Sequence, residues 1–115
     1  MKMLHVTIQT NRFEEVIKFY ENEVGLTLQG DLRPHKEIVF LANAEGETCV
    51  EVLHNPEADD AGNKNLSIGF KTDDVEKKRE EMVAAGYEVT PMISPMPDVK
   101  FFFAKDPAGV TVQFM

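Results

Sequence analysis

The chain has 115 residues, a formal net charge of −8 and a single cysteine, Cys49. This length suits one compact domain, and the apolar runs are too short for a membrane span or a signal peptide. The excess of acidic residues argues against nucleic acid and against an anionic membrane surface as partners, because phosphates bind to clustered lysine and arginine side chains. One cysteine excludes an internal disulfide and a cysteine-based zinc cluster, so we expect a reduced, cytoplasmic protein.

The first half of the chain predicts the order strand, helix, strand, strand, strand. Apolar side chains recur at helical spacing from Phe13 to Val24, with Thr10 or Asn11 as the expected N-cap. Gly25 follows where a helix end favours a positive φ. The strands are expected at 3–9, 26–29, 37–42 and 48–54.

The second half repeats this order after a polar linker at about 55–65. Asp73 or Asp74 is the expected N-cap of a helix that stops at Gly86. A tight turn, Asp106–Gly109, precedes the last strand. The strands of this half are expected at 66–71, 87–91, 100–104 and 110–114.

The two halves are an internal repeat with an offset of 62 positions. Leu4–Ile8 recurs as Leu66–Phe70, and Val50–Val52 recurs as Val112–Phe114. A repeat of this length indicates two copies of one structural module. Each sheet should then have an apolar face covered by its helix and an opposite face that carries a sparse set of polar groups.

His5 and Glu51 are the first half's best candidates for chemistry on the polar face, and Ser67 and Gln113 occupy the repeated positions. If the four strands surround one cavity, these four side chains line it. Because a buried, unpaired carboxylate is costly, Glu51 needs a histidine, a metal or a ligand donor as partner. A metal site would satisfy Glu51. A hydrogen bond between His5 and Glu51 without any metal would satisfy it equally well.

Other residues are candidates for ligand contact. Thr7 and Cys49 alternate onto the same face, although a single thiol is more often a small buried hydrophobe. Phe101 and Phe103 should share one face, where they can stack on a flat ligand. Met92 and Met96, in a proline-rich loop at 91–97, can form an adaptable apolar lid, and ordinary loop packing explains them equally well.

The order and spacing of four short motifs resemble a known family. The pattern is similar to the glyoxalase I, bleomycin-resistance and extradiol-dioxygenase group, the vicinal oxygen chelate superfamily, over nearly the whole chain. The motifs are Leu4-His5-Val6, Phe19-Tyr20 with Gly25-Leu26, Phe70-Lys71-Thr72-Asp73-Asp74-Val75 and Asp106-Pro107-Ala108-Gly109.

The resemblance implies an α+β fold of two β-α-β-β-β modules that form a cupped, incomplete barrel. It also implies a homodimer, since modules in this group are commonly paired across two copies. Residues 1–115 would be a single domain, with modules at about 1–54 and 66–115 on either side of the linker.

The resemblance further implies a divalent metal, Ni²⁺ or Zn²⁺, held by the first and last strands of each module. The ligands by position would be His5, Glu51 and Gln113, with Glu51 and Gln113 as the catalytic positions. Ser67, at the fourth position, is a poor ligand and is a ligand-binding candidate instead. Gln113 can offer an amide oxygen but cannot accept a proton as the carboxylate at the usual base position does.

Three functions are compatible with these residues. The first is a protein that binds a small molecule in a cavity with an incomplete metal site. The second is a glyoxalase-I-like, metal-dependent lyase or isomerase of the lactoylglutathione lyase type. The third is a non-catalytic protein whose role is interaction through its dimer. The sequence identifies neither the ligand nor a thiol cofactor.

Overall fold

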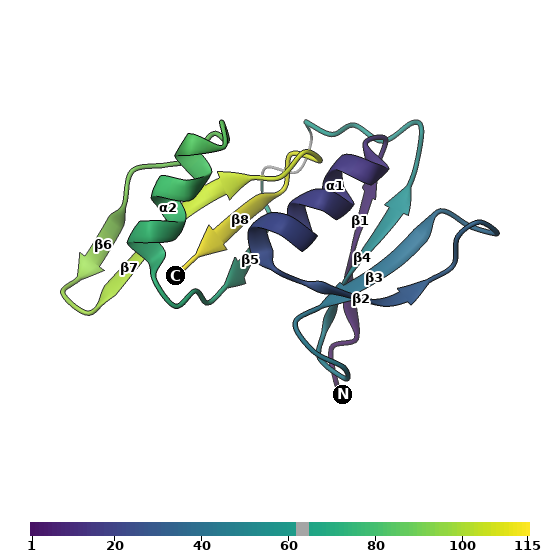
Figure 1. Cartoon of the computed structure of the whole chain (residues 1–115), viewed down its shortest axis with the longest axis horizontal. Helices are drawn as coiled ribbons and strands as arrows, with labels where there is room; N and C mark the ends of the chain where they lie inside the picture. Colours follow the sequence, from purple (N-terminus) through teal and green to yellow (C-terminus); the bar gives the residue numbers. More distant parts are fainter. Residues whose placement is uncertain (62–64) are drawn as a thin grey trace. The chain divides into compact units, whose positions relative to one another are not determined.

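Each half of the chain forms its own compact unit in the computed structural model, Met1–Asp60 and Ala61–Met115 (Figure 1). The structure describes residues 1–61 and 65–115. The elements of the first unit are β1 (His5–Thr10), α1 (Phe13–Phe19), a π-helical turn η1 (Tyr20–Val24), β2 (Thr27–Asp31), β3 (Ile38–Ala42) and β4 (Cys49–His54). Those of the second are β5 (Ser67–Phe70), α2 (Val75–Ala84), β6 (Ile93–Met96), β7 (Val99–Lys105) and β8 (Thr111–Phe114).

Both units are β-α-β-β-β modules, so the predicted α+β fold is confirmed. Each contains a four-stranded mixed sheet, in the order β1-β4-β3-β2 in one and β5-β8-β7-β6 in the other. The first strand pairs in parallel with the last, and the remaining pairs are antiparallel. Each sheet is open, with two edge strands, and neither closes into a barrel by itself.

The first sheet is two-faced, as its alternating pattern predicts. Along β1, Ile8 and Thr10 are buried while His5 and Thr7 are exposed. The buried face packs beneath α1, which lies across the sheet (Figure 1). The helix contributes an apolar stripe because its buried positions recur every three or four residues: Phe13, Val16, Ile17 and Phe19.

The beginning of α1 differs from the prediction. Arg12 is the N-cap residue and makes no side-chain cap hydrogen bond. Thr10 instead ends β1, where its buried hydroxyl accepts from the Arg12 N–H and donates to Asp60 Oδ2. The threonine hydroxyl is therefore used at the strand end, and Thr10 lies two residues before the capping position. Gly25 has φ +83° and ends the helical segment as predicted.

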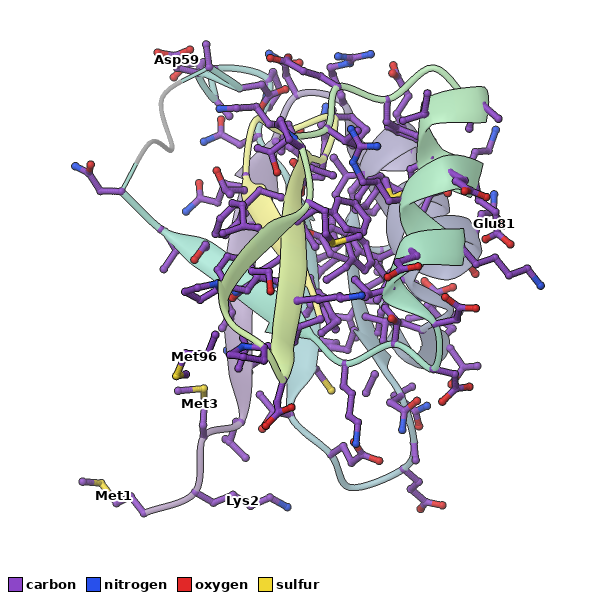
Figure 2. All side chains as sticks on the ribbon, turned by 90° about the vertical axis from the view of Figure 1, so that its left-hand side faces the viewer. Met1, Lys2, Met3, Asp59, Glu81 and Met96 are labelled. Atoms are coloured by element: carbon purple, nitrogen blue, oxygen red, sulfur yellow. The ribbon has the colours of Figure 1, made fainter. Side chains whose placement is uncertain are left out.

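The second helix begins and ends as expected. Asp74 is its N-cap, and its carboxylate accepts from the Lys77 N–H at 3.1 Å. Gly86 follows with φ +88°. Figure 2 shows Glu81 on the outer side of this helix. In the part of the chain that the structure describes, no helix combines the length and apolar character needed to cross a bilayer.

Asp74→Ala is expected to lower the free energy of unfolding by about 1 kcal/mol, because the Lys77 amide loses its capping acceptor. Urea unfolding followed by circular dichroism measures this loss. Asp73→Ala is the matched control, since it removes an adjacent exposed carboxylate that is not the N-cap. Equal losses in the two variants would contradict the capping role.

The predicted strand at 87–91 is wrong. Within that range a single bridge joins Val89 to Ala104, and regular pairing with β7 resumes only at β6. The range 91–97 was expected as a loop, but it contains β6. Its prolines suggested a loop because proline cannot donate to a sheet ladder, but β6 is an edge strand, where proline is tolerated. Met96 projects outward from this strand (Figure 2) and is exposed.

The faces of β7 are as predicted, with one correction to the repeat. Phe102 is fully buried, whereas Phe101 and Phe103 are half-buried on the opposite face. Phe40 pairs with Glu51 in the first sheet, and Phe103 pairs with Gln113 in the second. Phe40 therefore corresponds to Phe103, one position later than the offset of 62 indicates.

The predicted linker at about 55–65 belongs in part to the first unit. Asn55 donates through its backbone N–H to Thr10 O and through its side chain to Gln9 Oε1. Residues 62–64 of this linker lie outside the described residues. That 1–115 constitutes a single domain, with modules at 1–54 and 66–115, stays a prediction.

Candidate functional site

His5, Thr7 and Glu51 form a polar cluster on the face of the first sheet that α1 leaves open. Thr7 and Glu51 are partners in the parallel β1–β4 pairing. The Thr7 hydroxyl donates to Glu51 Oε1 at 2.5 Å, and His5 Nε2 lies 3.4 Å from the same oxygen. The Glu51 side chain is 13% exposed and that of His5 is 39% exposed. The pair predicted from sequence is therefore brought together, with Thr7 as a third member.

Phe40 supports this cluster from the neighbouring strand. It is the antiparallel partner of Glu51, and its ring meets the His5 ring edge-on with centroids 5.7 Å apart. Gly30 lies opposite Phe40, and a Cβ there would approach the phenyl ring to 3.2 Å. Any larger residue at position 30 would therefore displace the ring against which His5 packs. The alternation of β3 was the sequence signal for Phe40, and our sequence reasoning missed its role.

A hollow of about 320 Å³ lies beside His5 in the first unit. Cys49, the register partner of His5, lines it and is half-buried. The Cys49 thiol lies 3.6 Å from the Glu47 carbonyl oxygen. The other lining residues are Lys2, Met3, Leu4, Gln29, Gly46 and Glu47.

The second unit carries different chemistry at the same register positions. Gly69 pairs with Gln113 as Thr7 pairs with Glu51. Ser67 is exposed and takes the place of His5. A Cβ on Gly69 would lie 3.5 Å from Gln113 Oε1, so glycine leaves open space beside the amide. At these positions the second unit thus presents neutral groups where the first has an imidazole and a carboxylate.

Two aromatic side chains lie on the same face of the second sheet. Phe101 and Phe103 lie on it together, with ring centroids 5.6 Å apart in an edge-to-face contact. Met92 is half-buried, and Met96 sits in edge strand β6 opposite Val99. Met96 therefore belongs to a strand, whereas Met92 lies in the irregular segment that precedes β6, and the apolar lid stays a prediction.

The first unit supplies two of the donors that the divalent metal suggested by the sequence would need. Two ligands about 2.1 Å from a tetrahedral zinc ion lie about 3.4 Å apart, which matches the spacing of His5 Nε2 and Glu51 Oε1. Glu51 Oε1 already accepts a hydrogen bond from the Thr7 hydroxyl. Across residues 1–61 and 65–115, no group of three or more His, Cys, Asp or Glu side chains is placed to hold a metal. A catalytic zinc usually has three protein ligands, so these donors fit a metal only in part.

Comparison with known proteins identifies the family. Residues 2–114 match the Glyoxalase/Bleomycin resistance protein/Dioxygenase superfamily, and the chain belongs to this superfamily. The resemblance seen in the sequence is thereby confirmed.

Individual relatives extend over the full chain at low identity. A protein of Neisseria meningitidis serogroup A named lactoylglutathione lyase is 25% identical over 124 aligned positions, covering all of this chain and 90% of the relative. The trypanothione-dependent glyoxalase I of Leishmania major has 20% identity and a TM-score of 0.77, covering 100% of this chain and 86% of its own. TnmS3, an antibiotic-binding protein from Streptomyces sp. CB03234, has 19% identity and a TM-score of 0.77, with coverages of 99% and 93%. At these identities the two structures support the fold alone.

Proposed function

We propose that this protein binds a small molecule in a cavity and that its metal site is incomplete. One comparison carries the proposal. His5, Thr7 and Glu51 form a connected polar cluster in the first unit, whereas Ser67, Gly69 and Gln113 stand at the same register in the second. A single strong pair of ligands holds a divalent ion weakly, while hydroxyl, amide and imidazole groups suit hydrogen bonding to an organic ligand.

The hydrogen bonding of the cluster supports a role in ligand binding. Thr7 fixes one carboxylate oxygen of Glu51, and the Phe40 ring limits the positions of His5. A preorganised acceptor and a partly exposed imidazole can meet a ligand's donor groups without first reordering. We propose Thr7, Cys49, Ser67, Phe101 and Phe103 as further contacts.

Metal analysis tests this proposal. Protein purified without chelator and then dialysed against Ni²⁺ or Zn²⁺ is expected to hold well under one equivalent of metal by mass spectrometry, because two strong ligands are too few for tight binding. Glu51→Gln should change that content little. Stoichiometric metal that is lost in Glu51→Gln would overturn the incomplete site. Glu37→Gln, which removes a carboxylate paired with His54 instead of His5, is the matched control.

A glyoxalase-I-like lyase or isomerase is the second candidate, favoured by the full-length relative named lactoylglutathione lyase. Under this function His5, Glu51 and Gln113 would hold the metal, which supplies Lewis-acid stabilisation when bound. Glu51 would be the proton acceptor, since the amide of Gln113 cannot take that role. Gln113 would contribute an oxygen or an N–H to the site.

Lactoylglutathione lyase assay of protein loaded with Ni²⁺ separates the two candidates. We expect no turnover above that of a Glu51→Gln variant, because the site falls one strong ligand short. His5→Ala is the companion variant. Turnover that disappears in both variants would favour the lyase.

Two further proposals concern the state of the protein. We propose a homodimer, which the family resemblance implies, and light scattering after size exclusion measures this directly. A cytoplasmic location, expected from the single cysteine, stays a prediction.

A further inference from the structure

A second hollow, of about 270 Å³, lies entirely within the second unit, and Phe103 is the one lining residue that the sequence had also suggested for ligand contact. It sits where the segment before β6 meets β7 at the isolated Val89–Ala104 bridge. Its walls combine one aromatic ring, small apolar groups and a few polar side chains. The lining residues are Glu88, Val89, Thr90, Phe103, Ala104, Lys105 and Thr111.

The hollow places a cation next to an aromatic ring. Phe103 and Lys105 are two residues apart on β7, so both side chains point to the same face. At about 3.3 Å rise per residue, they stand about 7 Å apart along the strand. This is the reach of a single-ring compound whose charged group is separated from its ring by one or two bonds.

Two hydrogen-bond donors converge at the charged end. Lys105 and Thr111 are partners in the β7–β8 pairing. Among residues 1–61 and 65–115, neither the Lys105 ammonium nor the Thr111 hydroxyl has a side-chain partner. Unused donors of this kind are available to an acceptor, and a charged acceptor satisfies both.

The charge of the second unit also favours an anion. Residues 1–60 contain 5 basic and 12 acidic side chains, whereas residues 61–115 contain 7 basic and 8 acidic ones. An anionic ligand therefore meets little net repulsion from the unit that carries the hollow. Glu88 is the one acidic side chain in the lining, and it is exposed.

We propose that this hollow is a binding site for an aromatic carboxylate, with the ring on Phe103 and the carboxylate on Lys105 and Thr111. The inference rests on the proposed small-molecule function and names the chemical class of the ligand. The volume is slightly below the roughly 300–1,000 Å³ of sites for drug-sized ligands, so it suits a ligand with one ring. Glu88 disfavours a second negative charge and limits the class to monoanions.

The test is a titration of the ¹⁵N-labelled full chain with phenylacetate, followed by amide chemical shifts. Phenylacetate is expected to shift residues 88–90, 103–105 and 111. Phenylacetamide, its neutral analogue, is expected to bind about tenfold more weakly, because it loses the charge-assisted hydrogen bonds. Cyclohexylacetate should also bind more weakly, since it keeps the charge and lacks the aromatic ring.

Three variants test whether the ligand binds in this hollow: one removes its positive charge, one removes its negative charge, and one is a control outside it. Lys105→Met should weaken phenylacetate about tenfold and remove its advantage over phenylacetamide. Glu88→Gln should strengthen phenylacetate binding by about twofold to threefold by removing a nearby negative charge. Lys100→Met, which removes a lysine of the same strand that is paired with Glu76, should leave the affinity unchanged.

The outcomes separate this inference from the proposed function. If phenylacetamide binds as tightly as phenylacetate, or if Glu88→Gln weakens binding, the carboxylate class is overturned while small-molecule binding stands. If phenylacetate shifts only residues outside the hollow, the assigned site is overturned. If neither compound nor a general fragment set shifts any residue on the open faces, both proposals fail together.

Discussion

Combining Ser67→His with Gln113→Glu is expected to raise the affinity for Ni²⁺ or Zn²⁺ by about 100-fold or more. Removing a single outer-shell partner of a metal ligand typically costs 10- to 100-fold in affinity, so adding two direct ligands should have a larger effect. The substitutions place in the second unit the residue types that His5 and Glu51 provide at the same register in the first. Titration of chelator-treated protein by calorimetry measures the change.

The controls for this gain distinguish a shared site from added surface ligands. Each single variant should increase affinity by less than the pair. Gln9→Glu with Ser94→His adds the same groups at positions outside the predicted set and should leave affinity low. Removing Glu51 from the double variant should abolish most of the gain. An unchanged affinity in the double variant would show that positions 67 and 113 do not share a site with His5 and Glu51.

Phe102→Ala is expected to lower the free energy of unfolding by about 3–5 kcal/mol, because it removes a fully buried ring and leaves a cavity. Phe102 stacks on Phe114, its cross-strand partner, with ring centroids 5.2 Å apart. A loss of this size is a large share of the stability of a small domain. Urea unfolding monitored by circular dichroism measures it.

The neighbouring phenylalanine is a matched control for this variant. Phe101→Ala deletes the same ring from the half-buried open face and should cost about 1 kcal/mol. Phe102→Leu keeps most of the apolar volume, so it should cost less than Phe102→Ala and keep the assay usable if the alanine variant does not fold. Equal losses at positions 101 and 102 would contradict the assigned faces of β7.

Much of the fold could be predicted from sequence because its signals are local. Alternating polarity identified the open and covered faces of β1 and β4, and Gly25 and Gly86 marked the helix ends. The repeat at an offset of 62 predicted two modules of one design. It also singled out His5 and Glu51, which lie 3.4 Å from each other.

The errors occurred where a non-local contact overrode a local preference. The prolines at 91–97 favour a loop, yet pairing with β7 makes part of that range an edge strand. Threonine is a common N-cap residue, but the Thr10 hydroxyl donates a hydrogen bond to Asp60, which lies fifty residues away. Neither partner is visible in the neighbouring sequence.

The amino-acid sequence by itself determined the chemical asymmetry of the two modules, since it places an imidazole and a carboxylate in one and a hydroxyl and an amide in the other. Only the tertiary structure decided how those groups are used. The parallel register of β1 with β4 aligns Thr7 with Glu51, and the antiparallel register of β3 brings Phe40 against His5. Strand register depends on the hydrophobic pattern of the whole sheet and on the turns between its strands, so the identities of two side chains alone do not specify it.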